Sequence, residues 1–292
     1  MDFCSDWVRI SSMTARDRHA FTLIEVLVVL GIIVLLTGLI FPAMGMARKS
    51  SNSVASQSNL KQWGAATINY TTINKDRLPW EGNSAPSGSA SANMEENLLE
   101  KTFWANALAA LVGDRPYGGL VNQAVAGLGE IPAPGSRSVW VDPGADADPN
   151  APWQFGTDKT FYFNYVPNSR LNDSVATSLQ AKNEVITMHH ITDSAATVLM
   201  MEARSNEKEV SGSDFYSSSP LDLCKSDWHA FPNRYFEGGH IAFADGHVAH
   251  VLNDVGTRSF QDSRDPAQVG GDWNKPGKLV WNPRGPAGNV AP

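Results

Sequence analysis

The fold is decided by residues 16–41, which read Arg16-Asp-Arg-His-Ala-Phe21-Thr-Leu-Ile-Glu25 and continue as an apolar run to Phe41. The stretch from Phe21 to Phe41 is about 21 residues long, which is enough to span a bilayer as a helix. Glu25 is its only ionisable group. A carboxylate inside a membrane helix costs on the order of a few kcal/mol, so it usually marks a function or a partner.

This combination resembles the N-terminal signal of type IV prepilins and type II secretion pseudopilins. In that family a prepilin peptidase cuts before an aromatic or apolar residue, usually after Gly, and methylates the new amino terminus. The resemblance implies a cut between Ala20 and Phe21 and N-methylation of Phe21, with Ala in place of the usual Gly. Glu25 then takes the fifth mature position, which serves processing and assembly. Pro42 falls where many pilins carry a helix-kinking proline.

This stretch has two other interpretations. One is an ordinary signal anchor, and the other is a secretory signal peptide cut near the small-x-small sequence Gly45-Met46-Ala47. The length of the apolar run and the helical pattern that continues past Ala47 both count against a cut there. The start of the chain stays open between Met1 and Met13, and the second start gives a leader closer in length to those of the family.

Composition and charge exclude several classes of protein. The chain has 292 residues and 42% hydrophobic content. Its formal net charge is -7, and a mildly acidic surface argues against a nucleic-acid binder. The two cysteines, Cys4 and Cys224, are too few for a disulfide framework. Arg9, Arg16 and Arg18 precede the apolar run and favour a cytoplasmic amino terminus, with the rest of the chain outside the cytoplasm.

Three parts are expected: a leader over 1–20, a membrane-spanning and spine helix over 21–74, and an extracytoplasmic α+β domain over 75–292. The helix is predicted to continue beyond the membrane. Side chains suited to packing recur there at spacings of three and four residues, which places them on one face of a helix. These residues are Leu60, Trp63, Thr67, Tyr70 and Ile73.

The remaining elements are predicted from local patterns. A capping box at Asn93-Met-Glu-Glu96 begins a second helix that ends at Gly113, and residues 118–151 are predicted as mostly loop. Strands are predicted at 161–166, at 197–202 and, more weakly, at 185–190. The Asp245-Gly246 pair between two apolar runs predicts a two-residue type I′ hairpin turn. The expected fold class is α+β and pilin-like, with the long helix packed on an antiparallel sheet.

The C-terminal part carries a second resemblance. Tyr162-Phe-Asn-Tyr165, Ala196–Glu202 and Ile241–Val248 together resemble a prepilin-like family described by a His, nine residues and then Asp-Gly. In this chain nine residues separate Tyr235 from Asp245-Gly246, so Tyr235 stands at the position of that histidine. Any role that the family gives to the histidine is therefore in doubt here.

A zinc site in the hairpin is not expected. If Asp245 and Gly246 form the turn, Ala244 pairs with His247, and His250 then points to the opposite face from His247. His240 shares the face of His247 but lies about 13 Å along the strand, too far for one zinc ion. Adjacent His189 and His190 are likewise expected on opposite sides of a strand.

Calcium is left open at one loop. Its Asp146, Asp148 and Asn150 have the alternating oxygens of a calcium loop but lack its glycine and distant glutamate. No cofactor is predicted.

The predicted function is a pilin-like or pseudopilin subunit, and not an enzyme, because no nucleophile motif is present. The subunit is processed by prepilin peptidase and assembled with other pilin-like subunits through its N-terminal helix. It resides in the inner membrane as a single-pass protein before it joins a type IV pilus or a type II secretion-type filament. The alternative is a membrane-anchored extracytoplasmic enzyme or binding module that uses the helix only as a tether.

Overall fold

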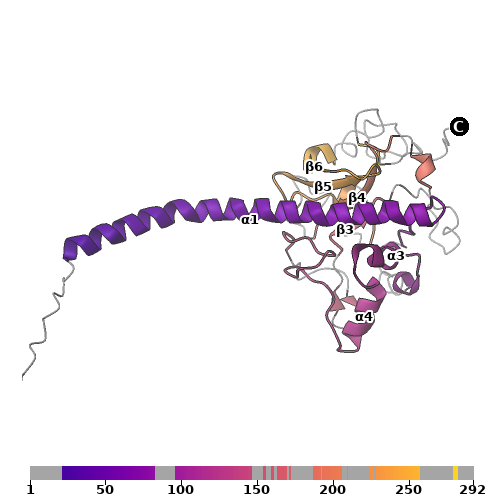
Figure 1. The fold of residues 1–292 in the computed structure, drawn as a ribbon, viewed down its shortest axis with the longest axis horizontal. Coiled ribbons are helices and arrows are strands. Elements are labelled where there is room, and N and C mark those ends of the chain that lie inside the picture. The colour runs from indigo at the N-terminus through magenta and orange to yellow at the C-terminus, as the bar shows by residue number, and fades with distance from the viewer. Residues whose placement is uncertain are drawn as a thin grey trace, which may run out of the picture. The chain divides into compact units, whose positions relative to one another are not determined.

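The computed structural model describes residues 22–82, 96–146, 154–155, 159–160, 163–169, 171, 187–191, 193–205, 209, 224–226, 228–256 and 279–281. The chain divides into two compact units, Met1–Ala47 and Arg48–Pro292. Helix α1 (Leu23–Ile73) begins in the first unit and ends in the second (Figure 1). The predicted long N-terminal helix is confirmed, and it is continuous through Pro42.

The first unit contains the apolar part of α1. Its most apolar window has a mean hydropathy of 2.9, and none of that window is buried in the protein. By length and composition this helix can cross a membrane. Its large apolar side chains, from Leu23 to Phe41, are exposed.

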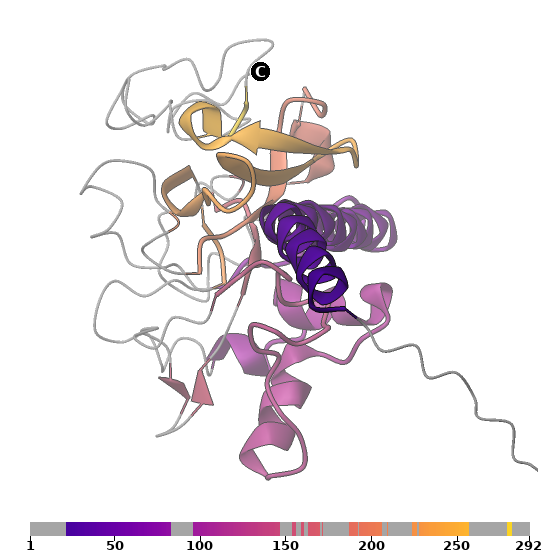
Figure 2. The ribbon, with the colours of Figure 1, turned by 90° about the vertical axis from the view of Figure 1, so that its left-hand side faces the viewer.

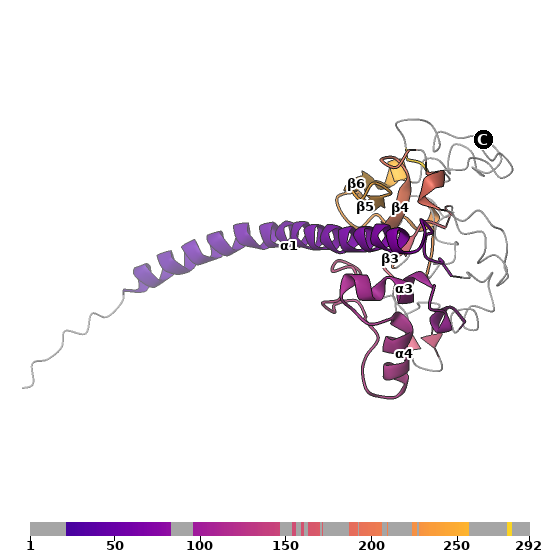
Figure 3. The same ribbon diagram turned by 45° about the vertical axis from the view of Figure 1, so that its right-hand side comes forward.

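The rest of α1 packs against the sheet of the second unit (Figure 3). Its buried positions again recur every three or four residues: Ser56, Leu60, Trp63, Gly64, Ala66, Thr67 and Thr71. Two residues that were predicted on this buried face are not fully buried: Tyr70 is half-buried and Ile73 is 71% exposed. Thr71 takes their place, because a straight helix gradually rotates a strict three-and-four pattern away from the core.

A four-stranded antiparallel sheet forms the centre of the second unit. Its strands lie in the order β3 (Tyr165–Pro167), β4 (Val198–Glu202), β5 (Gly238–Phe243) and β6 (Val248–Leu252). Figure 2 shows β5 and β6 in light orange. All residues of β4 and β5 are buried, whereas β6 is partly exposed at the edge. Two further short strands, β1 (Gln154–Phe155) and β2 (Lys159–Thr160), pair with each other.

The helical connections differ from the prediction. The single helix expected up to Gly113 is instead broken into helical residues 96–99, α3 (Trp104–Ala107) and the 3-10 helix η1 (Ala109–Val112). The break occurs at Phe103, which pairs with Trp80 in an isolated β-bridge. Backbone groups of residues 102 and 104 hydrogen-bond to Trp80 instead of continuing a helix. Asn93 lies outside the described residues.

Two other segments differ in part from the prediction. The described part of 118–151 is mostly loop, as predicted, but its first residues belong to α4 (Tyr117–Val125), whose two glycines favour a loop prediction. Gly118 is required there because a Cβ would lie 2.4 Å from the Leu98 carbonyl oxygen. Of the weak strand at 185–190, the described part holds the 3-10 helix η3 (Met188–His190). A further 3-10 helix, η5, spans Trp228–Ala230.

The hairpin between β5 and β6 has a three-residue turn rather than a two-residue one. The Phe243 amide donates to the His247 carbonyl, and the Gly246 amide donates to the Phe243 carbonyl. Gly246 has a φ of 90°, so a type I turn is followed by a left-handed glycine, which is the usual three-residue solution. The extra residue shifts the register by one and places His240 opposite His250.

Gly64 sets how closely α1 approaches β5. A Cβ built at Gly64 would lie 3.2 Å from the Ala242 Cβ, so a larger side chain must push the helix off the sheet. We expect Gly64→Leu to lower the free energy of unfolding by about 1–3 kcal/mol. Gly119→Leu in α4 is the matched control, because a Cβ there meets nothing within 4 Å. Equal urea midpoints for the two variants would contradict this packing.

Candidate functional site

The start of α1 is built by Thr22 and Glu25. Glu25 accepts hydrogen bonds from the Thr22 backbone amide (2.8 Å) and the Thr22 hydroxyl (2.7 Å), and the Glu25 amide donates to the Thr22 hydroxyl oxygen (3.3 Å). This reciprocal arrangement is a capping box, in which both residues satisfy amides that a helix start leaves without partners. Hydrogen bonds of this kind are electrostatically stronger in a low-dielectric medium than in water. Ala20 and Phe21, the expected cleavage point, lie outside the described residues.

Pro42 lies within α1 and does not end it. Between Glu25 and Arg48 the helix carries no charge, and its only hydroxyl, on Thr37, donates to the carbonyls of Ile33 and Val34. The exposed surface of this segment is therefore almost purely apolar, and Glu25 is the one polar group on it that can take a new partner.

A buried polar cluster joins α1 to the sheet in the second unit. Ser56, which is completely buried on α1, has its hydroxyl oxygen 2.7 Å from Asp142 and 2.9 Å from the Tyr165 hydroxyl, and it also contacts Glu202. Three separate segments and the helix thus converge on one hydroxyl group. We call the set Ser56, Asp142, Tyr165, Glu202, Glu209, Arg234, Tyr235 and His240 the buried polar cluster.

Arg234 is the permanent cation of this cluster. Its guanidinium donates to Asp142 (2.9 Å), to both oxygens of Glu209 (2.9 and 2.7 Å) and to the Ala203 carbonyl (2.9 Å). Its side chain is only 4% exposed. A planar guanidinium is suited to this multidentate role, which a lysine could not fill.

Tyr235 is the aromatic member of the buried polar cluster next to Arg234 in the sequence. Its hydroxyl donates to Asp142, and its ring lies 5.5 Å from that of His240. Gly144 allows this contact, since a Cβ there would lie 2.4 Å from the Tyr235 hydroxyl. Tyr235 thus has a structural place of its own in the buried polar cluster.

The surroundings shift the pKa values of the two carboxyl groups next to Ser56. Burial alone would raise the pKa of Asp142, but the Arg234 charge and hydrogen bonds from Ser56, Tyr235 and Gly144 outweigh it and leave the pKa lowered. Burial and the Asp142 charge raise the pKa of Glu202. The Ser56 hydroxyl has one proton and two neighbouring carboxyl groups, so it can donate to only one of them at a time.

His240, Glu202 and Ser53 form a line that resembles the arrangement in hydrolases. His240 Nδ1 lies 2.7 Å from Glu202, and its Nε2 lies 3.2 Å from the Ser53 hydroxyl. A nucleophile also needs donors for the developing oxyanion. Ser53 sits within α1, where backbone amides bond along the helix, and so the helix supplies none. The line therefore fits a structural link between α1 and the sheet better than a reaction centre.

Asp142 gives the cluster a dependence on pH. Its lowered pKa means that its charged form stabilises the fold above its ordinary pKa of about 4, and this contribution is lost as the pH falls through the lowered value. We expect Asp142→Asn to lower the free energy of unfolding by roughly 1–3 kcal/mol at pH 7. The difference from the unmodified chain should shrink below pH 4.

Thermal unfolding of both proteins between pH 3 and 7 measures this difference. Glu202 is present in both proteins, but the Asp142 charge is one cause of its raised pKa, so the comparison reports the titration of the two interacting carboxyl groups together. A difference that stays constant down to pH 3 would contradict the assignment.

The histidines are placed differently from the prediction. His240 and His250 face each other across the hairpin with ring centroids 5.5 Å apart, instead of His240 sharing a face with His247. His250 Nε2 contacts the Tyr235 carbonyl at 2.8 Å, and His247 bonds Asp245 at 2.6 Å. Among the described residues no group of three or more His, Cys, Asp or Glu side chains is placed to hold a metal ion.

The hairpin turn and the calcium loop are the remaining candidates from the sequence. Asp245 and Gly246 lie in the hairpin turn, where hydrogen bonds from the His247 amide and ring outweigh burial and lower the pKa of Asp245. Asp146 is exposed, whereas Asp148 and Asn150 lie outside the described residues. The calcium loop therefore stays a hypothesis.

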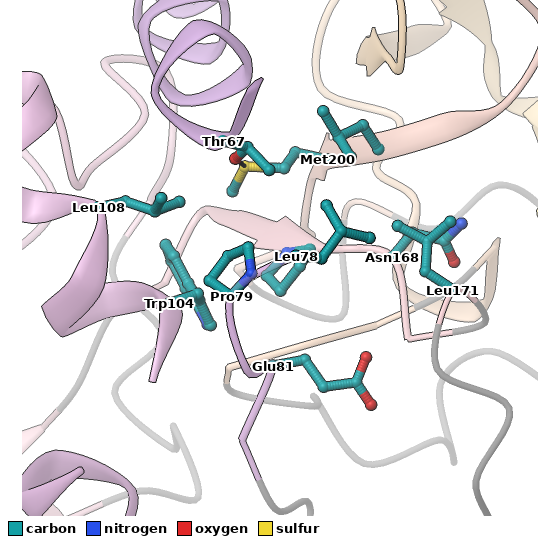
Figure 4. A pocket seen from close by; sticks show the side chains of 11 residues that line it. Thr67, Leu78, Pro79, Glu81, Trp104, Leu108, Asn168, Leu171 and Met200 are labelled. Atoms are coloured by element: carbon teal, nitrogen blue, oxygen red, sulfur yellow. Dashed lines mark hydrogen bonds between the residues drawn. The ribbon is translucent and has the colours of Figure 1, made fainter. Parts of the chain in front are cut away.

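A small apolar pocket lies beside the second part of α1 (Figure 4). Its wall includes Thr67 from α1, Met200 from β4 and Trp104 from α3. The carboxylate of Glu81 at its edge is paired with Lys225 at 2.6 Å. With that charge already partnered, the pocket presents no free polar group that we can assign to a ligand.

Sequence reasoning missed both the capping box and the buried polar cluster. The first had a local signal, because Thr22 and Glu25 have the spacing of a Ser/Thr-x-x-Glu box. The second had none, since its members lie far apart in the sequence, as Ser56 and Glu202 do at 146 positions.

Comparison with known proteins finds one family match. Residues 15–41 match the prokaryotic N-terminal methylation motif, a segment that includes Ala20, Phe21 and Glu25. No curated protein and no solved structure gives a significant match.

Proposed function

We propose that this chain, which is type IV prepilin-like by its methylation motif, is a structural subunit that prepilin peptidase cuts between Ala20 and Phe21. The observation that carries the proposal is the continuity of the motif with a 51-residue helix whose exposed apolar segment holds a single carboxylate. The peptidase then methylates Phe21. The mature subunit assembles with other pilin-like subunits in a type IV pilus or a type II secretion-type filament.

The three parts of the chain have separate roles in this proposal. Residues 1–20 are the leader, 21–74 are the membrane-spanning and spine helix, and 75–292 are the α+β domain outside the cytoplasm. The charge pattern supports this orientation, since Arg9, Arg16 and Arg18 outnumber Arg48 and Lys49 on the far side of the apolar run. Before assembly the subunit rests in the inner membrane.

Glu25 is the group that assembly uses. In the single chain its carboxylate is satisfied by Thr22, only three residues away. In a bundle of such helices it can instead pair with the Phe21 amino terminus of a neighbour, and low dielectric makes this attraction strong. The capping box thus holds the carboxylate until a neighbouring subunit supplies a cation.

Processing is tested by coexpression with an active prepilin peptidase and with an inactive variant of it. The unmodified chain should lose its leader only with the active enzyme. Ala20→Asp should abolish cutting, because a charged group replaces the small residue at the cleavage point. Arg9→Asp, farther from that point, is the control and should still be cut. Loss of the leader without active peptidase, or cutting of Ala20→Asp, would contradict the proposal.

The second candidate is the membrane-anchored extracytoplasmic enzyme or binding module, and the line of Ser53, His240 and Glu202 is where an ester-hydrolysing activity would have to reside. It requires neither cutting at Phe21 nor an acid at position 25. Uncut but ester-hydrolysing protein, with activity lost in Ser53→Ala, would support this candidate over the filament subunit.

A further inference from the structure

The turn that joins Tyr235 to Gly238 is strained. The two residues exchange backbone hydrogen bonds of 2.8 Å in both directions, so Phe236 and Glu237 are the central residues of a two-residue hairpin turn. Their φ angles are 44° and 65°, in the left-handed region that favours Gly or Asn. Such strain persists only where the surroundings fix it, and it is found preferentially at functional positions.

The surroundings do fix this turn. The Tyr235 carbonyl contacts His250 Nε2 at 2.8 Å, and the Asn253 amide donates to the Glu237 carbonyl at 2.8 Å. Gly238 pairs with Leu252 on β6, and a Cβ at Gly238 would lie 2.0 Å from the Val251 carbonyl oxygen. The chain therefore holds an unfavourable backbone conformation rigidly in place.

The turn exposes an aromatic side chain, that of Phe236, to solvent. Phe236 is 49% exposed, and Leu252, which pairs with Gly238 at the same end of the hairpin, is 45% exposed. The ammonium group of Lys49 on α1 lies 5.3 Å from the centre of the Phe236 ring. We call Lys49, Phe236 and Leu252 the Phe236 patch.

The position of Lys49 in the sequence fixes the level of this patch relative to a membrane. Between Glu25 and Arg48 there are 22 residues without a charge, residues 26–47. In a helix they extend about 33 Å, close to the hydrocarbon thickness of a bilayer of about 30 Å. Arg48 and Lys49 then lie where the apolar layer ends, at the level of the phosphate groups.

We propose that the Phe236 patch rests on the phospholipid headgroup layer of the membrane that α1 spans. Phe236 and Leu252 enter the headgroup boundary, and the Lys49 ammonium pairs with phosphate while its stem covers the ring. Arg48 and Lys49 supply two cations at this level, and anionic lipid strengthens their part of the contact. Lipid is the occupant because the covalent link to α1 keeps the patch at that surface continuously.

This contact rests on the membrane placement in the proposed function, and it adds a role to that placement. The strained turn would hold the domain in one orientation on the membrane before assembly. Extraction of the subunit into a filament would then have to break the contact.

A fluorescence experiment on the full chain tests the proposal. The chain, with Cys4→Ser and a Leu252→Cys reporter carrying a polarity-sensitive fluorophore, is placed in nanodiscs of phosphatidylcholine and phosphatidylglycerol. Cys224 is buried and leaves the reporter as the accessible thiol. Lipids with a nitroxide on the headgroup serve as the quencher. The control reporter is Leu128→Cys, a position that is 79% exposed in the same unit.

We expect at least twofold stronger quenching at position 252 than at position 128, and its loss in Phe236→Asp. Quenching at 252 that equals that at 128, or that survives Phe236→Asp, would overturn the contact. A third reporter, Leu30→Cys on α1, is read with nitroxide on the acyl chains. If it is quenched while position 252 is not, the headgroup contact fails and the membrane placement stands. If it is not quenched, the membrane placement and the contact both fail.

Discussion

Arg234→Met should destabilise the second unit severely, by about 3–5 kcal/mol in the free energy of unfolding. The substitution removes the cation but leaves Asp142 and Glu209 buried, each of which now faces Arg234 at 2.9 Å or less. The methionine restores much of the volume, so the cost is electrostatic rather than a cavity. For a domain of ordinary stability this is a large share of the total.

Urea unfolding of the detergent-solubilised chain, followed by tryptophan fluorescence, measures this cost. The signal is suitable because Trp63, Trp104 and Trp140 are buried in mutual contact in the second unit. Arg137→Met is the control, since Arg137 is exposed, and it should change the free energy of unfolding by less than about 0.5 kcal/mol. Indistinguishable midpoints for the two variants would show that the buried polar cluster contributes no stability.

Glu25→Leu should leave membrane insertion intact and abolish assembly. Insertion improves, if anything, because the only charge in the apolar segment is removed. Assembly loses the one group that can pair with the Phe21 amino terminus of a neighbour. The loss of a charge pair in a low-dielectric bundle is large compared with that of a surface pair.

The experiment compares membrane-bound and assembled fractions of the subunit in cells that carry the assembly machinery. Thr37→Leu is the control, since it also replaces a polar side chain of the same segment, but one that bonds within its own helix. It should assemble normally. Assembly of Glu25→Leu at the level of Thr37→Leu would remove the role proposed for the carboxylate.

The long helix and the sheet could be predicted because their signals are local. A 21-residue apolar run followed by residues spaced three and four apart determines α1, and alternation around an Asp-Gly pair determines the hairpin. The hairpin register could not be predicted, because one extra residue in the turn moves every pair by one. That single residue brought His240 opposite His250.

The short helices and the buried polar cluster depend on contacts distant in sequence. The bridge between Trp80 and Phe103 overrides a helical pattern, and α4 forms despite two glycines because Gly118 packs against the backbone at Leu98. Arg234 and Asp142 are 92 positions apart. Sequence patterning reveals which side chains are apolar, but it does not show which buried polar groups will meet.

The most direct test of the proposed function is mass spectrometry of the mature protein from cells with an active prepilin peptidase. A filament subunit predicts a chain that begins at Phe21 and carries one methyl group on its amino terminus. Phe21→Ala should still be cut, with less complete methylation. A mature chain that begins after Ala47, or a full leader retained in those cells, would contradict the filament subunit and favour the anchored module.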